Sequence, residues 1–266
     1  MKRFVYRPLY IVLSIIAIIA IWASCHTYKW HYEWLYKFGL IELPPTAVLS
    51  IGNEKFIAHA GGGIDGIMYT NSNEAFIQAI EDGYRFIEFD LRMTLDGHYF
   101  GAHKIDGFNE MTGHSSRWLL PPTASQVKER RLYDKYPPLL LSDIDEILDE
   151  HPDMILVVDK GEDYHKMIAE CPLPNRMIIE VSTVGQYIAA RHAGFPYVAF
   201  NNRDFDSIDE LGIKLIVAKS WWNPNDADLK QFMDNGGVAL VAGFDYAKDI
   251  PEDWLKANAL FYVDFK

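Results

Sequence analysis

The regular alternation of two kinds of segment is the feature that most restricts the fold of this chain. From residue 55 onward, short β-rich runs alternate with segments of helical periodicity, which is the pattern of a parallel α/β fold. Eight strands are predicted, over 55–59, 85–91, 154–159, 176–181, 197–200, 214–218, 238–242 and 260–264. Eight such units in roughly 212 residues predict a compact (β/α)8 TIM barrel. A doubly wound open sheet is the alternative, because periodicity alone cannot show that a sheet closes.

The segments between these runs contain the predicted helices, including 73–82, 142–150, 184–192, 226–235 and 252–258. One stretch breaks the alternation. Residues 97–137 follow the second predicted strand and contain a short β-rich run, a Met-Thr-Gly sequence and a Pro-Pro pair. We interpret this stretch as an insertion, an extra loop or small subdomain, that lies over the mouth of the barrel.

The composition is that of one globular domain with an appendage. Hydrophobic residues make up 49% of the 266 residues, which is enough for one sizeable core. The net charge of −12 is uneven, since residues 1–55 hold six basic and three acidic side chains (+3) and the remainder therefore carries −15. A globular part with this net negative charge lacks the row of basic residues that binds a phosphate backbone. This argues against a nucleic-acid partner.

An apolar segment without any charge covers residues 9–25. Lys2, Arg3 and Arg7 precede it, and several Trp and Tyr residues follow it, as at a membrane–water interface. Its 17 residues are at the lower limit for a spanning helix. We predict an N-terminal transmembrane helix, with a cleaved signal peptide or lipid modification of Cys25 as alternatives.

The basic N-terminus is expected to stay in the cytoplasm. The chain would then be a single-pass membrane protein with its C-terminal domain outside, in the periplasm or the extracellular space. The predicted organisation is a cytoplasmic tail and transmembrane helix (1–25), a juxtamembrane connector (26–54) and a barrel domain (55–266). Pro44-Pro45 prevents one continuous helix from the membrane into the barrel.

Two histidines stand near the ends of β-rich runs, where TIM barrels carry their active sites. His59 ends the first predicted strand, and the glycines at 61–63 after it let backbone amides approach an anion closely. His103 ends the short run inside the insertion. Histidine exchanges protons most readily near neutral pH, so this pair suggests an acid and a base. A lone histidine at a strand end is more often structural, which is the alternative for each.

Carboxylates end the second and third predicted strands. Glu88 and Asp90 lie two residues apart, so their side chains point to the same face. Burying them is costly unless they are paired or coordinated, and together they are the minimum for a hard divalent cation. A strand with its polar face in solvent is the alternative. Asp159 is a candidate third ligand and Lys160 a candidate phosphate contact, with an ordinary salt bridge as the alternative.

Several short motifs follow one another in a fixed order along residues 55–160. They are His59-Ala60-Gly61, Tyr69-Thr70-Asn71-Ser72 with Ala75-Phe76, Glu88-Phe89-Asp90, Thr94-Leu95-Asp96-Gly97, His103-Lys104 and Asp159-Lys160. In this order they resemble the glycerophosphodiester phosphodiesterase family, a TIM barrel related to phosphatidylinositol-specific phospholipases C. The resemblance is tight over 55–160 and loose over 161–266. Ordered motifs in one register are far more specific than any one of them alone.

Four positions depart from the family pattern. The arginine after the first histidine is Ala60, the glutamate of Pro-Glu-Asn-Thr is Thr70, and the aspartate after the second histidine is Lys104. In the Glu-x-Lys motif, a gapless alignment puts Val158 at the glutamate, so Asp159 fits only after a shift of one residue. The loss of the arginine matters because a guanidinium forms bidentate hydrogen bonds with phosphate, whereas lysine binds phosphate as a point charge.

The resemblance implies metal-assisted cleavage of a phosphodiester. Glu88, Asp90 and Asp159 would hold one Ca²⁺ or Mg²⁺, and oxygen ligation argues against zinc. His59 and His103 would be the catalytic acid and base, in an order that the sequence leaves open. The expected substrate contacts are Lys160, Asn71, Gly61 and Trp221, although Trp221 is equally suited to packing on the barrel.

The expected reaction is hydrolysis of a glycerophosphodiester to an alcohol and glycerol 3-phosphate. The substrate is a small molecule or the head group of a lipid or surface polymer. Two alternatives remain: a lyase on the same barrel that forms a cyclic phosphate, and a catalytically inert binding module. Ala60 and the shifted Asp159 favour the binding module.

Overall fold

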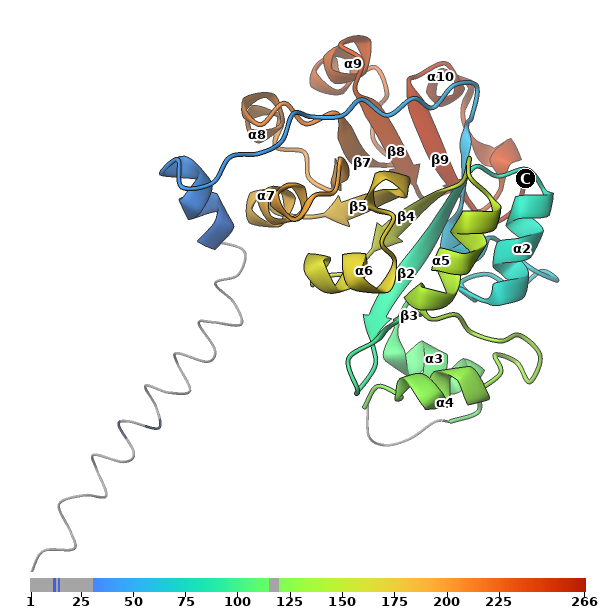
Figure 1. The fold of residues 1–266 in the computed structure, drawn as a ribbon. Helices are drawn as coiled ribbons and strands as arrows, with labels where there is room; N and C mark the ends of the chain where they lie inside the picture. The colour runs from blue at the N-terminus through green and yellow to red at the C-terminus, as the bar shows by residue number, and fades with distance from the viewer. Residues whose placement is uncertain (1–11, 13, 15–30, 115–119) are drawn as a thin grey trace, which may run out of the picture.

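The computed structural model describes residues 12, 14, 31–114 and 120–266. Eight parallel strands form the barrel: β1 (Phe56–Ala58), β2 (Phe86–Met93), β4 (Ile155–Asp159), β5 (Met177–Val181), β6 (Tyr197–Phe200), β7 (Leu215–Lys219), β8 (Val238–Ala242) and β9 (Ala259–Val263). β1 pairs with both β2 and β9, which closes the ring (Figure 1). The predicted (β/α)8 barrel and its eight strands are confirmed, and the alternative of an open sheet is wrong.

Helices pack around the outside of the barrel (Figure 1). They are α2 (Asn73–Glu81), α5 (Leu141–Glu150), α6 (Tyr164–Glu170), α7 (Val184–Ala193), α8 (Phe205–Glu210), α9 (Ala227–Asp234) and α10 (Glu252–Leu255). Several begin at a side chain that caps the helix, as Ser72 does for α2 and Thr183 for α7. Such a cap accepts a hydrogen bond from a backbone amide that the helix leaves unpaired, so it fixes where the helix starts.

The core has two layers because side chains alternate across each strand. Inside the barrel lies a cluster that includes Val157, Ile178 and Leu240. Between the strands and the helices lies a larger cluster, which includes the next residue of β4, Val158. The inward direction of Val157 fixes the direction of Asp159, which is two residues further along the same strand.

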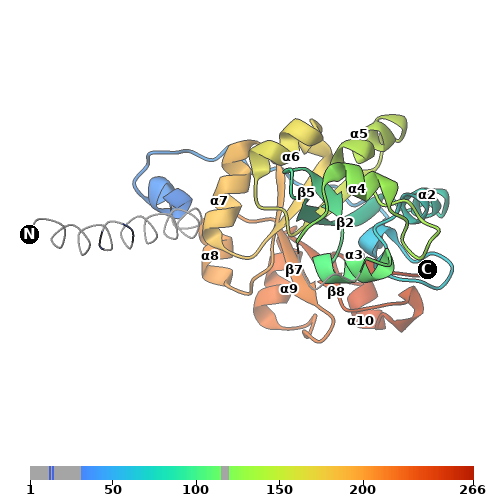
Figure 2. The same cartoon turned by 90° about the horizontal axis from the view of Figure 1, so that it is seen from below.

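The predicted insertion lies between β2 and α5. It contains β3 (Tyr99–Gly101), which is antiparallel to β2, and the short helices α3 (Ile105–Met111) and α4 (Ala124–Glu129). Phe100, Phe108 and other side chains form a hydrophobic cluster of its own. Viewed from below, α3 and α4 lie in front of the barrel (Figure 2). The insertion is therefore a small subdomain at the end of the barrel toward which β2 runs.

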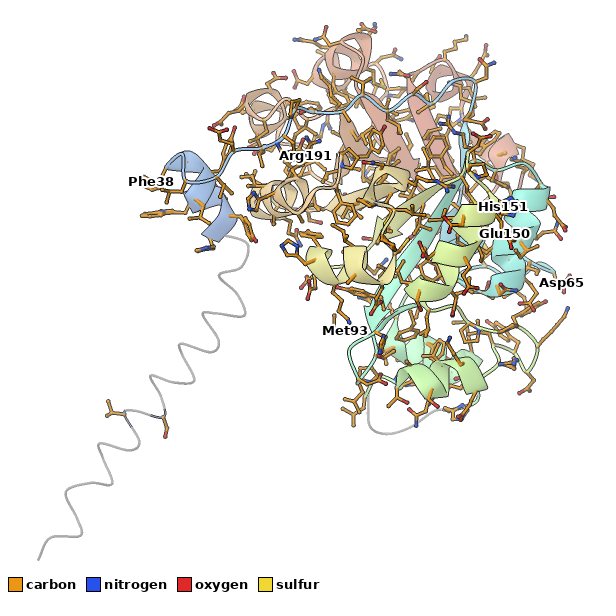
Figure 3. The ribbon with its side chains drawn as sticks, viewed as in Figure 1. Phe38, Asp65, Met93, Glu150, His151 and Arg191 are labelled. Atoms are coloured by element: carbon orange, nitrogen blue, oxygen red, sulfur yellow. The ribbon has the colours of Figure 1, made fainter. Side chains whose placement is uncertain are left out.

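The segment before β1 packs against the barrel. Residues 31–37 are helical, and the ring of Tyr32 lies 5.9 Å from that of His192 in α7. Arg191, only 1% exposed, donates hydrogen bonds to the carbonyl oxygens of Pro44 and Pro45 (Figure 3). The Pro-Pro pair predicted to interrupt a helix is thus also bound to the barrel domain.

Two residues of the connector close the N-terminal end of the barrel. Leu49 and Ile51 are buried in the interior cluster together with Phe86 and Val238, which begin β2 and β8. The guanidinium of Arg85 donates to the carbonyl oxygen of Ser50 at 3.0 Å. Leu49 and Ile51 therefore share the interior core of the barrel, although they precede residue 55, where the barrel domain is predicted to begin.

The predicted transmembrane helix over 9–25 lies outside the described residues, apart from Val12 and Ser14. Within the described part of the chain, no helix is both long enough and apolar enough to cross a membrane.

Candidate active site

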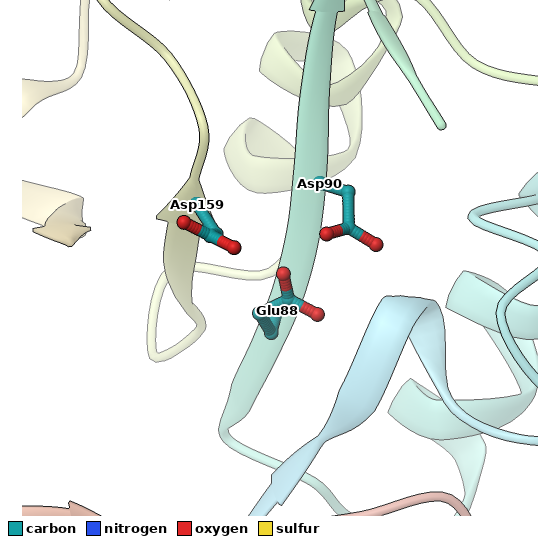
Figure 4. Close-up of side chains that lie close together, drawn as sticks. All are labelled: Glu88, Asp90 and Asp159. Atoms are coloured by element: carbon teal, nitrogen blue, oxygen red, sulfur yellow. The ribbon is translucent and has the colours of Figure 1, made fainter. Parts of the chain in front are cut away.

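Three carboxylates meet where β2 and β4 end. Glu88 and Asp90 lie on β2, and Asp159, the last residue of β4, pairs with Asp90 in the parallel register. One oxygen from each carboxylate lies within 4.8 Å of the others (Figure 4). The structure thus brings together the three residues that the sequence suggested as metal ligands.

The two carboxylates of β2 are almost fully buried, and their pKa values are shifted in opposite directions. Burial raises the pKa of Glu88 well above its usual range, and the neighbouring Asp90 carboxylate adds to the effect. Burial acts in the same direction on Asp90, but hydrogen bonding to His103 and the ammonium of Lys160 outweigh it and hold the pKa well below its usual range. Negative charge in the cluster is therefore better stabilised on Asp90 than on Glu88.

The loop after β1 holds both carboxylates. The amide of Ala60 donates to Glu88 Oε2 at 2.7 Å. Asn71 is fully buried, donates from Nδ2 to Asp90 Oδ2 at 3.1 Å, and accepts from the Asp90 amide at 3.0 Å. Ala60 and Asn71 both have φ of 48°, in the left-handed region that non-glycine residues rarely adopt. Asn71, predicted as a substrate contact, bonds to Asp90 through both ends of its amide.

His59 is paired with a buried carboxylate that the sequence analysis did not single out. Its Nδ1 lies 3.4 Å from Oδ1 of Asp264, which directly follows β9. The Asp264 side chain is completely buried, and neither oxygen has a hydrogen-bond partner among the described residues. A buried carboxylate needs a partner, and His59 is the ionisable group beside it. The signal in the sequence was an acidic residue at the end of a strand, as at Asp159.

His103 is oriented in the same way, by Asp90. Its Nδ1 lies 3.2 Å from Asp90 Oδ1. The ring of Tyr69 lies close to both histidines, 4.8 Å from that of His59 and 5.4 Å from that of His103. Both histidines are partly exposed, at 24% and 41%. The predicted acid–base pair therefore lies at one end of the barrel, beside the carboxylates.

The course of β4 explains the one-residue shift in its motif. Val158 packs between the sheet and the helices, while Asp159 is on the inward side and joins the cluster. A glutamate at position 158 would point away from the site, so Asp159 is the residue of this strand that can serve as a ligand. Lys160, predicted as a phosphate contact, donates to Asp90 Oδ1 and Asp159 Oδ2.

A second polar pair lies inside the barrel. The hydroxyl of Tyr262 on β9 donates to Oε1 of Glu180 on β5. Burial, together with the nearby charge of Asp159, raises the pKa of Glu180 to about 8. The Tyr262 ring lies 6.1 Å from that of His59. Glu180 is not among the residues predicted from the sequence, although a lone glutamate within the run Met177–Val181 is a signal of the same kind as Glu88.

The structure gives the two remaining candidates different surroundings. Gly61 is buried, and a Cβ there would lie 3.5 Å from the Cβ of Ala75, so the glycine packs against α2. Trp221, on the loop after β7, is 76% exposed. Its exposure argues against the alternative that it packs on the barrel, and leaves contact with a substrate as its predicted role.

The sequence of this chain matches a known protein family. Residues 59–213, more than half of the chain, match the model of the glycerophosphoryl diester phosphodiesterase family. The chain belongs to this family. The match begins at His59 and includes the three clustered carboxylates and His103. As a family member, the protein is a phosphoric diester hydrolase.

Solved structures support the fold. A glycerophosphodiester phosphodiesterase from Parabacteroides distasonis is 18% identical, with a TM-score of 0.62 over 80% of this chain and 93% of that chain. One from Thermotoga maritima is 17% identical, with a TM-score of 0.60 over 79% of this chain and 95% of that chain. No curated protein matches the chain. At these identities the likeness concerns the fold.

The donor set of the cluster fits the divalent cation that the family uses. All three groups offer carboxylate oxygen, the ligand that Ca²⁺ and Mg²⁺ prefer. Two of the groups are buried against a fixed hydrogen-bond framework, so they are already positioned. The cluster can therefore hold a hard cation beside two histidines.

Proposed function

We propose that this protein hydrolyses a glycerophosphodiester to an alcohol and glycerol 3-phosphate with a divalent cation, Ca²⁺ or Mg²⁺, and two histidines. The observation that carries the proposal is the position of the acid–base pair. Tyr69 lies close to both His59 and His103, and His103 is itself bonded to a carboxylate of the cluster. Cleaving a phosphodiester needs one group to take a proton from water and another to give one to the leaving alcohol.

Each histidine is prepared for proton transfer by a carboxylate at Nδ1. Nδ1 of His59 lies beside Asp264 and Nδ1 of His103 lies beside Asp90, which leaves Nε2 of each ring for the substrate. The carboxylate also stabilises the imidazolium that forms when the ring takes up a proton. The paired arrangement serves a base and an acid equally, so the two histidines can exchange a proton with the substrate in sequence.

Glu88, Asp90 and Asp159 would hold the cation. Bound there, it would supply positive charge to the phosphoryl oxygens, which become more negative as the phosphodiester is cleaved. This contribution matters here because the family arginine is replaced by Ala60, whose amide donates to Glu88 instead. The cation would therefore be the main source of positive charge for the substrate.

The proposal includes a single-pass membrane anchor at residues 9–25, with the barrel outside the cytoplasm. Its support is the uncharged apolar segment preceded by Lys2, Arg3 and Arg7. The exposed aromatic side chains Trp34 and Phe38, just after it, suit a membrane interface. The test is fractionation of cells that produce the full chain, followed by protease treatment of cells whose outer layers have been removed and whose plasma membrane is intact. Barrel fragments released only after lysis would contradict the outward orientation.

The activity test uses glycerophosphocholine and measures glycerol 3-phosphate and choline release. We expect turnover with Mg²⁺ or Ca²⁺ and its loss in EDTA, in Glu88→Gln and in either His→Ala variant. The losses for the histidines should be about 10²–10⁴-fold in kcat. Turnover unchanged by EDTA and by Glu88→Gln would rule out the metal-dependent mechanism. A stable cyclic phosphate as the end product would identify the lyase instead.

A further inference from the structure

The ammonium group of Lys160 lies within the carboxylate cluster. It bonds to Asp90 Oδ1 and Asp159 Oδ2, which belong to two of the three candidate metal ligands. The Lys160 side chain is only 22% exposed, so these ion pairs are largely shielded from water. A lysine that binds phosphate would need its ammonium directed at the substrate anion. Here the ammonium instead neutralises the oxygens that a cation would use.

The backbone explains how the side chain reaches this position. Asp159 is on the inward side of β4, so the next residue of a regular strand would point outward, toward the helices. Lys160 instead has φ of 66°, in the left-handed region, and β4 ends at the residue before it. Such a conformation is strained and persists only where its surroundings maintain it. The two ion pairs of the ammonium are the contacts that compensate.

We propose that Lys160 is a built-in competitor of the divalent cation. Its ammonium balances Asp90 and Asp159 when the cation is absent and must leave them when the cation binds. An ammonium and a divalent ion cannot use the same oxygens, since like charges a few ångströms apart repel strongly in a buried site. Metal affinity is lowered by the free energy of breaking the two ion pairs. This inference rests on the proposed metal site and adds a residue that sets its affinity.

The test is calorimetric titration of the metal-depleted full chain with MgCl₂ and with CaCl₂. We expect Lys160→Met to bind at least about tenfold more tightly than wild type, because the competing charge is gone. Lys214→Met is the control, since Lys214 directly precedes β7, at the end of the barrel away from the carboxylates. Its effect should be well below tenfold. Equal or weaker binding by Lys160→Met would overturn the inference.

Melting temperatures measured with and without cation provide a second test, which does not depend on Lys160→Met folding as well as wild type. Lys160→Gln keeps a hydrogen-bond donor but removes the charge. In EDTA, both Lys160 variants should melt below wild type, because the carboxylates have lost their countercharge. Added cation should raise their melting temperatures by more than that of wild type. An equal or smaller rise in both variants would also overturn the inference.

The same titrations separate this inference from the proposed function. If wild type and Lys160→Met bind cation equally, the metal site stands and the competition is refuted. If neither binds, the metal-dependent mechanism is refuted, and the inference is refuted with it. If only the variant binds, the competition is confirmed and the wild-type enzyme does not hold a resident metal. Glu88→Gln in each background should abolish binding and identifies the site as the one titrated.

Discussion

At the scale of residues, the carboxylates beside the two histidines differ in how many other groups they contact. Asp90 contacts His103, Asn71 and Lys160 and is also a candidate metal ligand. Asp264 is buried, and among the described residues it contacts His59 alone as an ionisable partner. A change at Asp90 therefore disturbs several functions together, whereas a change at Asp264 reports on His59.

We predict that Asp264→Asn lowers kcat on glycerophosphocholine by about 10²-fold or more and changes KM little. The amide has the shape of the carboxylate but cannot stabilise the imidazolium of His59. The measurement is steady-state kinetics over a range of pH. Asp226→Asn, at the exposed start of α9, is the control and should retain wild-type kinetics. A rise in KM at constant kcat would contradict a role through His59.

Glu180 gives a prediction about pH and stability. Its pKa is raised to about 8, so between its ordinary value and pH 8 the folded state holds a proton that the unfolded state has lost. Stability contributed by this group is therefore present at low pH and is lost as pH rises through about 8. Glu180→Gln, which keeps an acceptor for Tyr262, should remove this loss. In EDTA, the variant should exceed wild type at pH 8 by a free energy of unfolding on the order of a few kcal/mol.

The measurement is urea unfolding of both proteins at pH 5 and pH 8. The difference in stability between them should grow with pH. A constant difference across this range would mean that Glu180 does not titrate with a raised pKa.

At the scale of elements, the sequence predicted all eight barrel strands but not helices α6 and α8. Strands such as Ile155–Asp159 are apolar runs of a kind that only buried parallel strands require. Helices α6 and α8 have seven and six residues, fewer than two turns, so their periodicity carries little signal. Their positions depend on packing against the finished barrel, which no local pattern contains.

In the candidate site too, some residues were predictable from the local sequence, whereas some contacts depend on the folded barrel. His59, Glu88 and Asp90 were predictable because each stands at or near the end of a strand. The pairing of His59 with Asp264 was not, because it needs the barrel to close and bring β9 beside β1. The direction of Lys160 was not predictable either, since it depends on one left-handed residue.

The connector and α7 are joined by Arg191, and this contact gives a further prediction. The buried guanidinium donates to the carbonyl oxygens of Pro44, Pro45 and Pro196. Arg191→Met would leave these acceptors unsatisfied and should lower the free energy of unfolding by about 2–4 kcal/mol. Urea unfolding measures it. The control is Arg203→Met, which removes an exposed ion pair with Asp226 and should cost no more than about 1 kcal/mol. Equal losses in the two variants would contradict the role of Arg191.

At the scale of the whole molecule, the barrel is closed at one end and functional at the other. Leu49 and Ile51 fill the N-terminal end, and the carboxylates and histidines lie where the strands finish. This division follows the general rule for TIM barrels, in which one face provides stability and the other provides chemistry. Residues upstream of β1 are therefore part of the folded unit.

We predict that Leu49→Ala and Ile51→Ala each lower the free energy of unfolding by about 2–4 kcal/mol, because they open a cavity in the barrel interior. Val48→Ala is the control, since Val48 is 68% exposed, and it should be nearly neutral. Urea unfolding measures the stability, and kcat on glycerophosphocholine should stay at the wild-type value in all three. A loss of activity without a loss of stability would show that this end also serves the reaction.

The left-handed residues around the site have a consequence for how this protein would respond to selection. Ala60, Tyr69, Asn71 and Lys160 all have positive φ and all surround the carboxylates and histidines. At Ala60, glycine would relieve this strain by roughly 1 kcal/mol and remove only a methyl group. At Asn71 and Lys160, it would also remove the side chains that bond to Asp90. A laboratory selection for heat resistance would therefore have to gain most of its stability elsewhere in the barrel, and the backbone around the carboxylates would stay strained in the variants that it yields.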